Sequence, residues 1–465
     1  MAIDVSVIAT SSLGDRSYLA TDGEVAVVID PQRDIDRVLT LAGREQVRIT
    51  HVAETHLHND YVSGGRHLAQ LAGAQYLMAA GEEVGFDRIP VADDDVVPVS
   101  DRMRLRVLAT PGHTFHHVSY VLDQPDTDGG WAPVGVFTGG SLLFGTTGRT
   151  DLLGTVHARE LAHQQHTSAR RLADLLPDGT QIWPTHGFGS YCSTRQADAP
   201  ESTIGREKGV NPVLRLAADE FVAQTIDLDA YPAYYAHMGA ANAAGPAPVD
   251  LTPVARADVG ELRERLAAGQ WVVDLRQRRA YAAAHLAGTV SLGLDGPMST
   301  WLGWLINWGA PVTLLAETPE QIAEAQRELA RIGIDRPAAA AAGRPEEWAV
   351  DRGQLGDLPV SDFAGLAAAR NGELPGLPHP DVVLDVRLGS EWRAGHLDGA
   401  VHIPLYALPD RLAQLPDGAV WVHCSSGYRS AAAASLLANA GRQVVLVDDL
   451  FSRVASAGLP MATGG

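Results

Sequence analysis

The stretch ETHLHNDY at residues 54–61 decides how the first half of this chain is interpreted, because it places metal-binding side chains at a strand end. Residues 47–53 before it predict a strand that runs into a loop. Side chains two positions apart in an extended segment point the same way, so His56 and His58 can converge on one ion. Asp60, two residues further on, can approach the same ion. The spacing therefore predicts a metal site.

The composition of the whole chain is that of a globular protein with several domains. It has 465 residues, of which 46% are hydrophobic and 20% are charged. The formal charge of −20 argues against nucleic acid or an anionic membrane as a partner. No apolar run reaches the roughly 20 residues of a membrane span, and the first residues lack the pattern of a signal peptide. With only 2 cysteines a disulfide framework is not expected, and we expect a cytoplasmic protein.

Further motifs follow at the ends of later predicted strands, and two of them contain histidine, His113 and His186. These motifs are PGHT at 111–114, FTG at 137–139 and PTHG at 184–187. With the first motif, the set resembles the metallo-β-lactamase superfamily. The resemblance implies an αββα sandwich over residues 1–240 with metal at one edge.

The tetrad GRTD at residues 148–151 narrows the resemblance to the persulfide dioxygenase branch. In place of a histidine that serves a second metal in the superfamily, this chain has Tyr61, which favours one ion over two. In that branch the ion is Fe(II), held by two histidines and one carboxylate with open positions for O₂ and a thiol persulfide. The resemblance therefore implies one Fe(II), with Zn(II) as the alternative.

The chain departs from this branch where its carboxylate ligand is expected, because Gly140 follows the FTG motif. Three outcomes stay open. His56, His58 and His113 can form a three-histidine site that suits zinc or iron. Alternatively, Asp60 supplies the missing carboxylate, or the site binds metal weakly or not at all.

Three residues near these motifs have two interpretations each. His186 is either a further ligand or a histidine that supports the ligands. Cys192 lies in a Gly/Ser-rich loop. In the fused persulfide dioxygenases that this chain resembles, a cysteine near the active site follows a similar run. Cys192 therefore either holds or relays sulfur or is simply a buried apolar residue. Arg149 either pairs with an anionic substrate or forms a structural salt bridge. We assign the other histidines here to the surface or to packing: His116, His117, His157, His163 and His166.

An internal repeat occupies the second half of the chain, after a predicted linker at residues 239–248. The motifs VDLR and HLAG of the first copy recur at one offset as LDVR and HLDG in the second. Alternating strands and helices predict two small α/β domains with mainly parallel sheets, at 252–350 and 358–465, and both resemble rhodanese sulfurtransferase domains. Residues 337–360, rich in Ala, Gly and Pro, are expected to join them.

The second copy carries a cysteine loop suited to sulfur chemistry. A predicted strand runs into Cys424, and a helix is expected to begin at Ser430. A thiol beneath backbone N–H groups and a helix N-terminus has a stabilised thiolate, and the same N–H groups can hold a terminal sulfur. Arg429 adds positive charge after four intervening residues, one fewer than in the related phosphatases, which hold a larger group. The expected cradle consists of Ser425, Ser426, Gly427 and Tyr428.

The first copy has lost this loop. Residues 315–319, LAETP, stand where the cysteine should be, and Gln321 aligns with Arg429. Without a thiolate this copy cannot carry sulfur, so we expect a structural spacer or a docking surface.

The complete layout, α/β and α+β multidomain, resembles a persulfide dioxygenase–rhodanese fusion. The resemblance implies an enzyme that oxidises a low-molecular-weight thiol persulfide with O₂ to sulfite and transfers sulfur through Cys424 between persulfide, sulfite or thiosulfate and a thiol. It also implies a homo-oligomer. Two alternatives stay open: a zinc-dependent thioester hydrolase like hydroxyacylglutathione hydrolase, and a non-catalytic metallo-β-lactamase-like domain beside the rhodanese.

Overall fold

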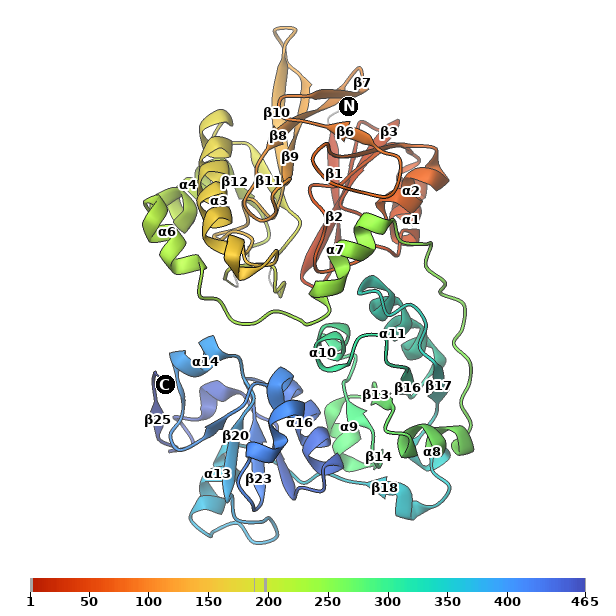
Figure 1. Cartoon of the computed structure of the whole chain (residues 1–465), viewed down its shortest axis with the longest axis vertical. Helices are drawn as coiled ribbons and strands as arrows, with labels where there is room; N and C mark the ends of the chain where they lie inside the picture. Colours follow the sequence, from red (N-terminus) through yellow and green to blue (C-terminus); the bar gives the residue numbers. More distant parts are fainter. Residues whose placement is uncertain (1–2, 188, 196–198, 465) are drawn as a thin grey trace. The chain divides into compact units, whose positions relative to one another are not determined.

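The computed structural model describes residues 3–187, 189–195 and 199–464 (Figure 1). The chain divides into two compact units. The first consists of Met1–Asp250 with Ala330–Gly333, and the second of Leu251–Leu329 with Ile334–Gly465. Within the described ranges, every helix is too short or too polar to cross a membrane.

Two six-stranded sheets form the middle of the first unit. One has the order β1-β2-β3-β4-β5-β6, antiparallel up to β3 and parallel beyond it. Its strands are β1 (Asp4–Thr10), β2 (Asp15–Thr21), β3 (Val25–Ile29), β4 (Arg48–Ala53), β5 (Gln75–Ala79) and β6 (Ile89–Val91). The other has the order β12-β11-β10-β9-β8-β7, with only β10 and β11 parallel among its described pairs. Its strands are β7 (Val96–Ser100), β8 (Met103–Ala109), β9 (Val118–Pro125), β10 (Trp131–Gly139), β11 (Gln181–Pro184) and β12 (Ser202–Thr203).

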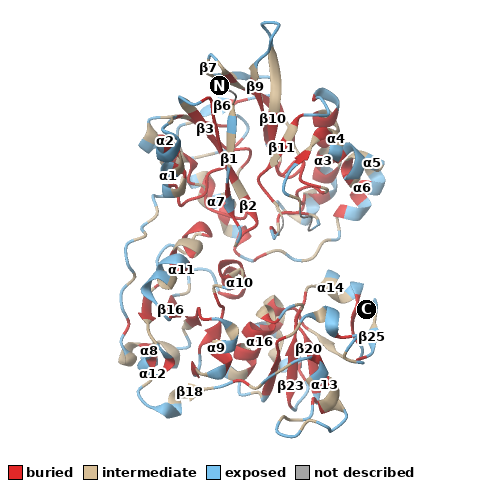
Figure 2. Cartoon of the chain, turned by 180° about the vertical axis from the view of Figure 1, so that it is seen from behind, coloured by how far each residue is buried: buried red, intermediate tan, exposed pale blue. Residues whose placement is uncertain are grey.

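The two sheets pack face to face, and helices cover their outer faces (Figures 1 and 2). Alternate side chains such as Leu77, Val107 and Phe137 point between the sheets and are fully buried. The outer face of the first sheet packs against α1 (Asp36–Glu45) and α2 (Gly65–Ala72). The outer face of the second sheet packs against α3 (Thr155–Leu175), α4 (Ile204–Val210), α5 (Pro212–Arg215) and α6 (Ala218–Thr225). This confirms the predicted αββα sandwich.

The predicted linker at residues 239–248 is wrong in its first part, because α7 (Tyr235–Ala244) covers it. Its alanines favour helix even though they show no hydrophobic period. Asn242 on this helix donates to the carbonyls of His58 at 2.8 Å and Tyr61 at 2.9 Å. The side-chain oxygen Oδ1 of Asn242 accepts from the N–H of Ser63 at 2.8 Å. The helix therefore holds the loop that carries the first histidine motif.

The second unit contains two parallel sheets, one for each sequence repeat. The first, in the order β15-β13-β16-β17, consists of β13 (Trp271–Asp274), β15 (Val290–Ser291), β16 (Val312–Ala316) and β17 (Ala339–Ala342). The second, in the order β19-β24-β23-β20-β22, consists of β19 (Val360–Ser361), β20 (Val382–Asp385), β22 (Val401–His402), β23 (Val420–His423) and β24 (Val444–Val447). Two antiparallel pairs complete the strands: β14 (His285–Leu286) with β18 (Leu355–Gly356), and β21 (His396–Leu397) with β25 (Met461–Ala462).

Helices flank both sheets of the second unit. The first repeat has α8 (Val259–Ala267), α9 (Arg278–Ala283), α10 (Met298–Leu305), α11 (Pro319–Arg331), α12 (Pro345–Trp348) and the short 3₁₀ helix η1 (Arg352–Gln354). The second has α13 (Phe363–Arg370), α14 (Gly389–Ala394), α15 (Leu408–Arg411), α16 (Tyr428–Asn439) and the 3₁₀ helices η2 (Leu405–Ala407), η3 (Leu412–Gln414) and η4 (Phe451–Arg453). The predicted connection at 337–360 is wrong at its start, because β17 pairs with β16 there.

Each repeat contains one buried ion pair at the same place, at the end of β13 in the first repeat and at the end of β20 in the second. Arg276 Nη2 lies 2.7 Å from Asp274 Oδ2, and Arg387 Nη2 lies 2.6 Å from Asp385 Oδ2. Both arginines are almost fully buried, and each also donates from its own backbone N–H to the same aspartate. The matching pair is structural evidence for the internal repeat.

Because Asp385 is completely buried, removing its charge leaves Arg387 as an uncompensated buried cation. We expect Asp385→Asn to lower the unfolding free energy of the second unit by about 3–5 kcal/mol. The matched control, Asp417→Asn, changes an exposed aspartate of the same repeat and should leave stability unchanged. Denaturant unfolding of both full-length variants measures the difference, and equal midpoints would contradict the role of the pair.

Candidate functional site

The sequence motifs of the first unit converge at one edge of the sandwich, where β4, β8, β10 and β11 end. The rings of His56 and His58 lie 4.2 Å apart between centroids, and those of His56 and His113 lie 4.8 Å apart. The ring centroid of His186 lies 5.1 Å from that of His113. All four side chains are at most 1% exposed. The structure therefore brings together the four histidines that the sequence singled out.

Three of these histidines are held through Nδ1 and leave Nε2 without a hydrogen-bond partner among the described residues. Nδ1 of His56 bonds to the hydroxyl of the preceding threonine at 2.8 Å. Nδ1 of His113 lies 2.7 Å from the carbonyl of Arg149, and Nδ1 of His186 lies 3.0 Å from Asp15. Metal-binding histidines are usually fixed in this way through the nitrogen that faces away from the ion. This arrangement leaves three buried imidazole nitrogens available to bind a metal ion.

His58 is held from the opposite nitrogen. Its Nε2 lies 3.1 Å from Glu54 and 3.0 Å from the hydroxyl of Tyr61, while Nδ1 has no partner within the described part of the chain. Burial disfavours the charged ring, but the carboxylates of Asp30 and Glu54 outweigh it and raise the pKa of His58 to about 10. Tyr61 also donates to the carbonyl of Asp30 at 3.2 Å. Tyr61 thus supports His58.

His117 also lies in this cluster, stacked on His56 at 5.0 Å. Both of its nitrogens are engaged: Nδ1 with Thr110 at 2.9 Å, and Nε2 as acceptor for the N–H of Gly140 at 3.0 Å. It therefore orients the loop at Gly140 and is not a ligand in this geometry. The sequence assigned His117 to surface or packing, because no motif surrounds it.

Asp60 lies behind His186. Its Oδ2 is 3.2 Å from Nδ1 of His186, beside Asp15. Although burial disfavours the charged ring, these two carboxylates raise the pKa of His186 to about 9. Burial and the charge of Asp60 in turn raise the pKa of Asp15 to about 7. This geometry favours Asp60 as a residue that orients His186 over Asp60 as the replacement ligand.

Three groups of possible ligands share His186, and in each group the ligand atoms lie within 4.8 Å of one another. The other members are His56 and His58 in the first group, His113 and Cys192 in the second, and Asp15 and Asp60 in the third. A hollow of about 10 Å³ borders His56 and His58, roughly the room of one water molecule. The cluster can therefore hold an ion in a nearly closed site.

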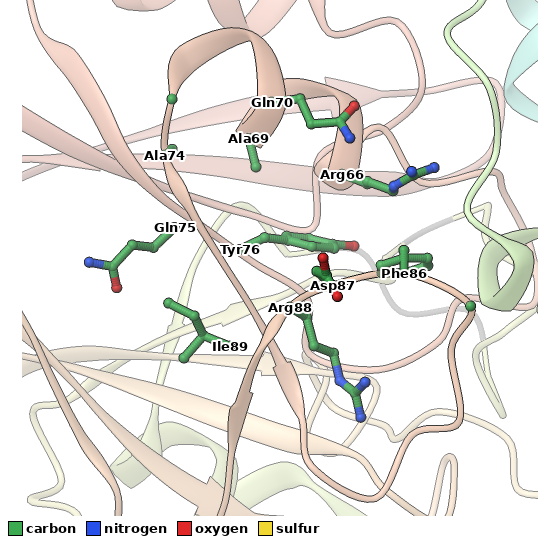
Figure 3. A pocket seen from close by; sticks show the side chains of 12 residues that line it. Arg66, Ala69, Gln70, Ala74, Gln75, Tyr76, Phe86, Asp87, Arg88 and Ile89 are labelled. Atoms are coloured by element: carbon green, nitrogen blue, oxygen red, sulfur yellow. The ribbon is translucent and has the colours of Figure 1, made fainter.

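A larger hollow lies on the surface nearby, between α2 and the strands that follow it (Figure 3). The ring of Tyr76 forms part of its wall, and Arg66 and Arg88 contribute positive charge. The hydroxyl of Tyr76 donates to Glu54 at 3.2 Å, and Glu54 holds His58. A hydrogen-bond chain thus connects this hollow to the histidine cluster.

Arg149 lies beside the cluster with its guanidinium engaged. It makes two hydrogen bonds to Asp151, at 2.6 and 2.7 Å, and stacks over the ring of Tyr231 at 4.7 Å. It is 4% exposed. Of the two interpretations, the geometry favours the structural salt bridge.

The cysteine loop of the second unit begins where β23 ends. The N–H of Gly427 donates to Sγ of Cys424 at 3.2 Å, and the hydroxyl of Ser430 lies 3.5 Å away. Gly427 has a φ of 97°, which lets the loop turn beneath the start of α16. Arg429 donates to Ser425 at 2.7 Å and forms a two-pronged ion pair with Glu391 at 2.5 and 2.8 Å. The rim of the loop is therefore more nearly neutral than Arg429 alone suggests.

The cysteine-less repeat contacts this loop from outside. Arg278 pairs with Asp448 at 2.7 Å and reaches the carbonyl of Ser426 at 3.4 Å. The hydroxyl of Tyr428 donates to the carbonyl of Gly293 at 2.9 Å. The sequence expected a spacer or docking surface and missed Arg278, since only the pairing of the two repeats brings it to the loop.

Comparison with known proteins finds relatives of both units. A rhodanese-like domain matches residues 372–456. A hydroxyacylglutathione hydrolase of Pseudomonas putida is 30% identical over 212 residues, covering 40% of this chain and 75% of the relative. The mitochondrial persulfide dioxygenase of Homo sapiens is 30% identical over 224 residues, covering 47% of this chain and 76% of the relative. The chain belongs to the metallo-β-lactamase-fold family. A metallo-β-lactamase structure from Staphylococcus aureus has a TM-score of 0.66 and 29% identity, covering 74% of this chain and 99% of that chain.

This metallo-β-lactamase-fold chain thus combines a first unit homologous to both persulfide dioxygenase and hydroxyacylglutathione hydrolase with a rhodanese-like domain. The predicted fusion architecture is confirmed. The fold, the relatives and the histidine cluster together support a metal in the first unit.

Position 140 of this family member is closed to a side chain. A Cβ atom there would lie 2.3 Å from Cδ2 of His113 and 2.5 Å from its Cγ. At Gly148 on the other side, a Cβ would lie 2.6 Å from Nδ1 of the same ring. The ring of His113 therefore fills the space between two glycines, and the carboxylate missing at position 140 has no room in this arrangement.

We expect Gly140→Ala to displace His113 and to lower metal affinity by at least about tenfold. The matched control is Gly179→Ala, because a Cβ at Gly179 meets no described atom within 4 Å. Metal content per chain after anaerobic reconstitution measures the effect. Equal metal content in both variants would show that the position of His113 does not matter for binding.

Proposed function

We propose that this protein oxidises a low-molecular-weight thiol persulfide to sulfite at the histidine cluster and transfers sulfane sulfur through Cys424. The observation that carries the proposal is the complete cysteine loop, with Sγ of Cys424 facing the N–H of Gly427 at 3.2 Å, on one chain with a persulfide dioxygenase homologue. A persulfide-oxidising centre and a sulfur carrier act on the same sulfur. Their joining on one chain favours this function over an unrelated hydrolase.

The first reaction consumes one thiol persulfide, one O₂ and one water and gives one thiol and one sulfite with release of protons. The terminal sulfur is oxidised and O₂ is reduced. A bound metal, Fe(II) in this proposal, supplies the activation of O₂. The ligands proposed from this geometry are His56, His58, His113 and His186, and the residues proposed to orient them include Asp15, Asp60 and Glu54. The closed surroundings of the cluster limit the access of water.

The second reaction uses Cys424 as the nucleophile. Its thiolate attacks the outer sulfur of thiosulfate, a sulfur–sulfur bond forms on Sγ, and sulfite leaves with the electron pair of the broken bond. A second thiolate then takes the outer sulfur and Cys424 leaves as thiolate. The N–H of Gly427 and the N-terminus of α16 stabilise the negative sulfur in both steps.

We expect anaerobic reconstitution with Fe(II) to confer oxygen uptake on addition of glutathione persulfide, with one sulfite formed for each O₂ consumed. His186→Ala should reduce uptake to the level of metal-free protein, because it removes the residue that three groups of possible ligands share. His163→Ala is the control, since that ring lies half-exposed beside Asp219. An oxygen electrode and a sulfite assay measure both products.

A different outcome distinguishes the second candidate function. Hydrolysis of an acylglutathione by the zinc-loaded protein, with no oxygen uptake by the iron-loaded protein, would replace the proposed dioxygenase by a thioester hydrolase. The homology to hydroxyacylglutathione hydrolase makes this the alternative to test.

Cys424→Ser should lower sulfite release from thiosulfate with a thiol acceptor by more than about a thousandfold, because the loop loses its nucleophile. Ser456→Ala, at an exposed position of the same repeat, is the control. The assay is independent of the metal. If transfer survives in Cys424→Ser, another group carries the sulfur.

A further inference from the structure

The side of the histidine cluster that faces His113 has no carboxylate from position 140, and it cannot receive one there. The ring of His113 fills the space above Gly140, and its Nδ1 is fixed on the carbonyl of Arg149 at 2.7 Å. Its Nε2 is completely buried without a hydrogen-bond partner among the described residues. This nitrogen therefore points at a position that some other group must complete.

The group found at that position is the thiol of Cys192. Its Sγ and one ring nitrogen each from His113 and His186 all lie within 4.8 Å of one another. Cys192 is completely buried. Nε2 of His186 is likewise buried and without a partner in the described ranges.

The backbone fixes this cysteine as firmly as it fixes His113. The N–H of Arg149 donates to the carbonyl of Cys192 at 2.7 Å, and the carbonyl of Arg149 accepts from His113. Gly148 and Ser193 form a β-bridge alongside. One residue of the 148–151 segment thus binds both the histidine and the cysteine. Their relative position is set by backbone hydrogen bonds and does not depend on a flexible side chain.

We propose that Cys192 is a ligand of the metal centre, taking the place of the carboxylate that Gly140 lacks. The centre then combines imidazole nitrogens with one thiolate, a donor set that suits zinc or iron. The inference rests on the metal centre of the proposed function. It assigns Cys192 a place at the ion before any substrate binds, in contrast to a free sulfur relay.

Cobalt(II) tests this assignment, because a thiolate bound to cobalt gives an intense charge-transfer band in the near ultraviolet that imidazole ligands do not give. The chain has 2 cysteines, so the full-length Cys424→Ser variant leaves Cys192 as the sole thiol. We expect metal-stripped Cys424→Ser protein to develop this band on addition of cobalt. Changing Cys192→Ser in the same background should abolish the band and weaken cobalt affinity by at least about tenfold.

The outcomes separate this inference from the function on which it rests. If the Cys424→Ser protein shows visible cobalt bands that depend on His186 but no near-ultraviolet band, the thiolate ligand is overturned and the metal centre is still supported. No cobalt bands at all would overturn both. Because the Cys424→Ser spectrum alone decides the question, a folding failure of Cys192→Ser does not leave it open. Circular dichroism of each variant verifies the fold.

Discussion

The carboxylate of Asp30 joins the ends of three strands and thereby fixes the histidine edge of the sandwich. It follows β3 with a φ of 51°, a conformation that aspartate tolerates better than most side chains. It accepts hydrogen bonds from the N–H and hydroxyl of Thr55, at 2.7 and 2.8 Å, and from the hydroxyl of Thr185, and it lies 3.3 Å from His58. Thr55 precedes His56, and Thr185 precedes His186. The carboxylate of Asp30 therefore positions two histidines from distant segments. Because a buried charge with these hydrogen bonds is costly to disturb, their positions are fixed.

The sequence identified the four histidines that the structure brings together, because the motifs that contain them are local and their spacing follows strand geometry. The residues that hold those ligands were not predictable in the same way. Asp15 and Asp30 come from strands far from their partners in sequence, and nothing in their local pattern separates them from surface aspartates. Helix α7 was missed for a related reason: its alanines show no hydrophobic period, and its importance lies in the hydrogen bonds of Asn242 to the motif loop. Long-range contacts decide these positions.

In the two repeats of the second unit, local sequence likewise identifies a continuous motif but not the long-range contacts around it. Local sequence identified the Cys424 loop and its loss in the first copy, because the loop is one continuous segment. The contribution of the first copy to the surroundings of Cys424 depends on how the copies pack. Arg278 and Arg279 both pair with the buried carboxylate of Asp448, at 2.7 and 2.5 Å. A repeat without a nucleophile thus still shapes the loop that has one, which gives a physical reason for its retention.

The loss of the carboxylate at position 140 changes where negative charge lies around the histidines. In a two-histidine, one-carboxylate site, the carboxylate meets the ion directly. Here Asp15 and Asp60 stand behind His186, and Glu54 stands behind His58, so their charge reaches an ion through the imidazole rings and makes those rings stronger donors. Neutral nitrogens alone would leave the full charge of a divalent ion in a buried site of low dielectric, which is unfavourable. A thiolate in contact with the ion reduces that charge by one unit, as the carboxylate does. In the proposed centre, a buried cysteine therefore meets the same electrostatic requirement as a carboxylate ligand.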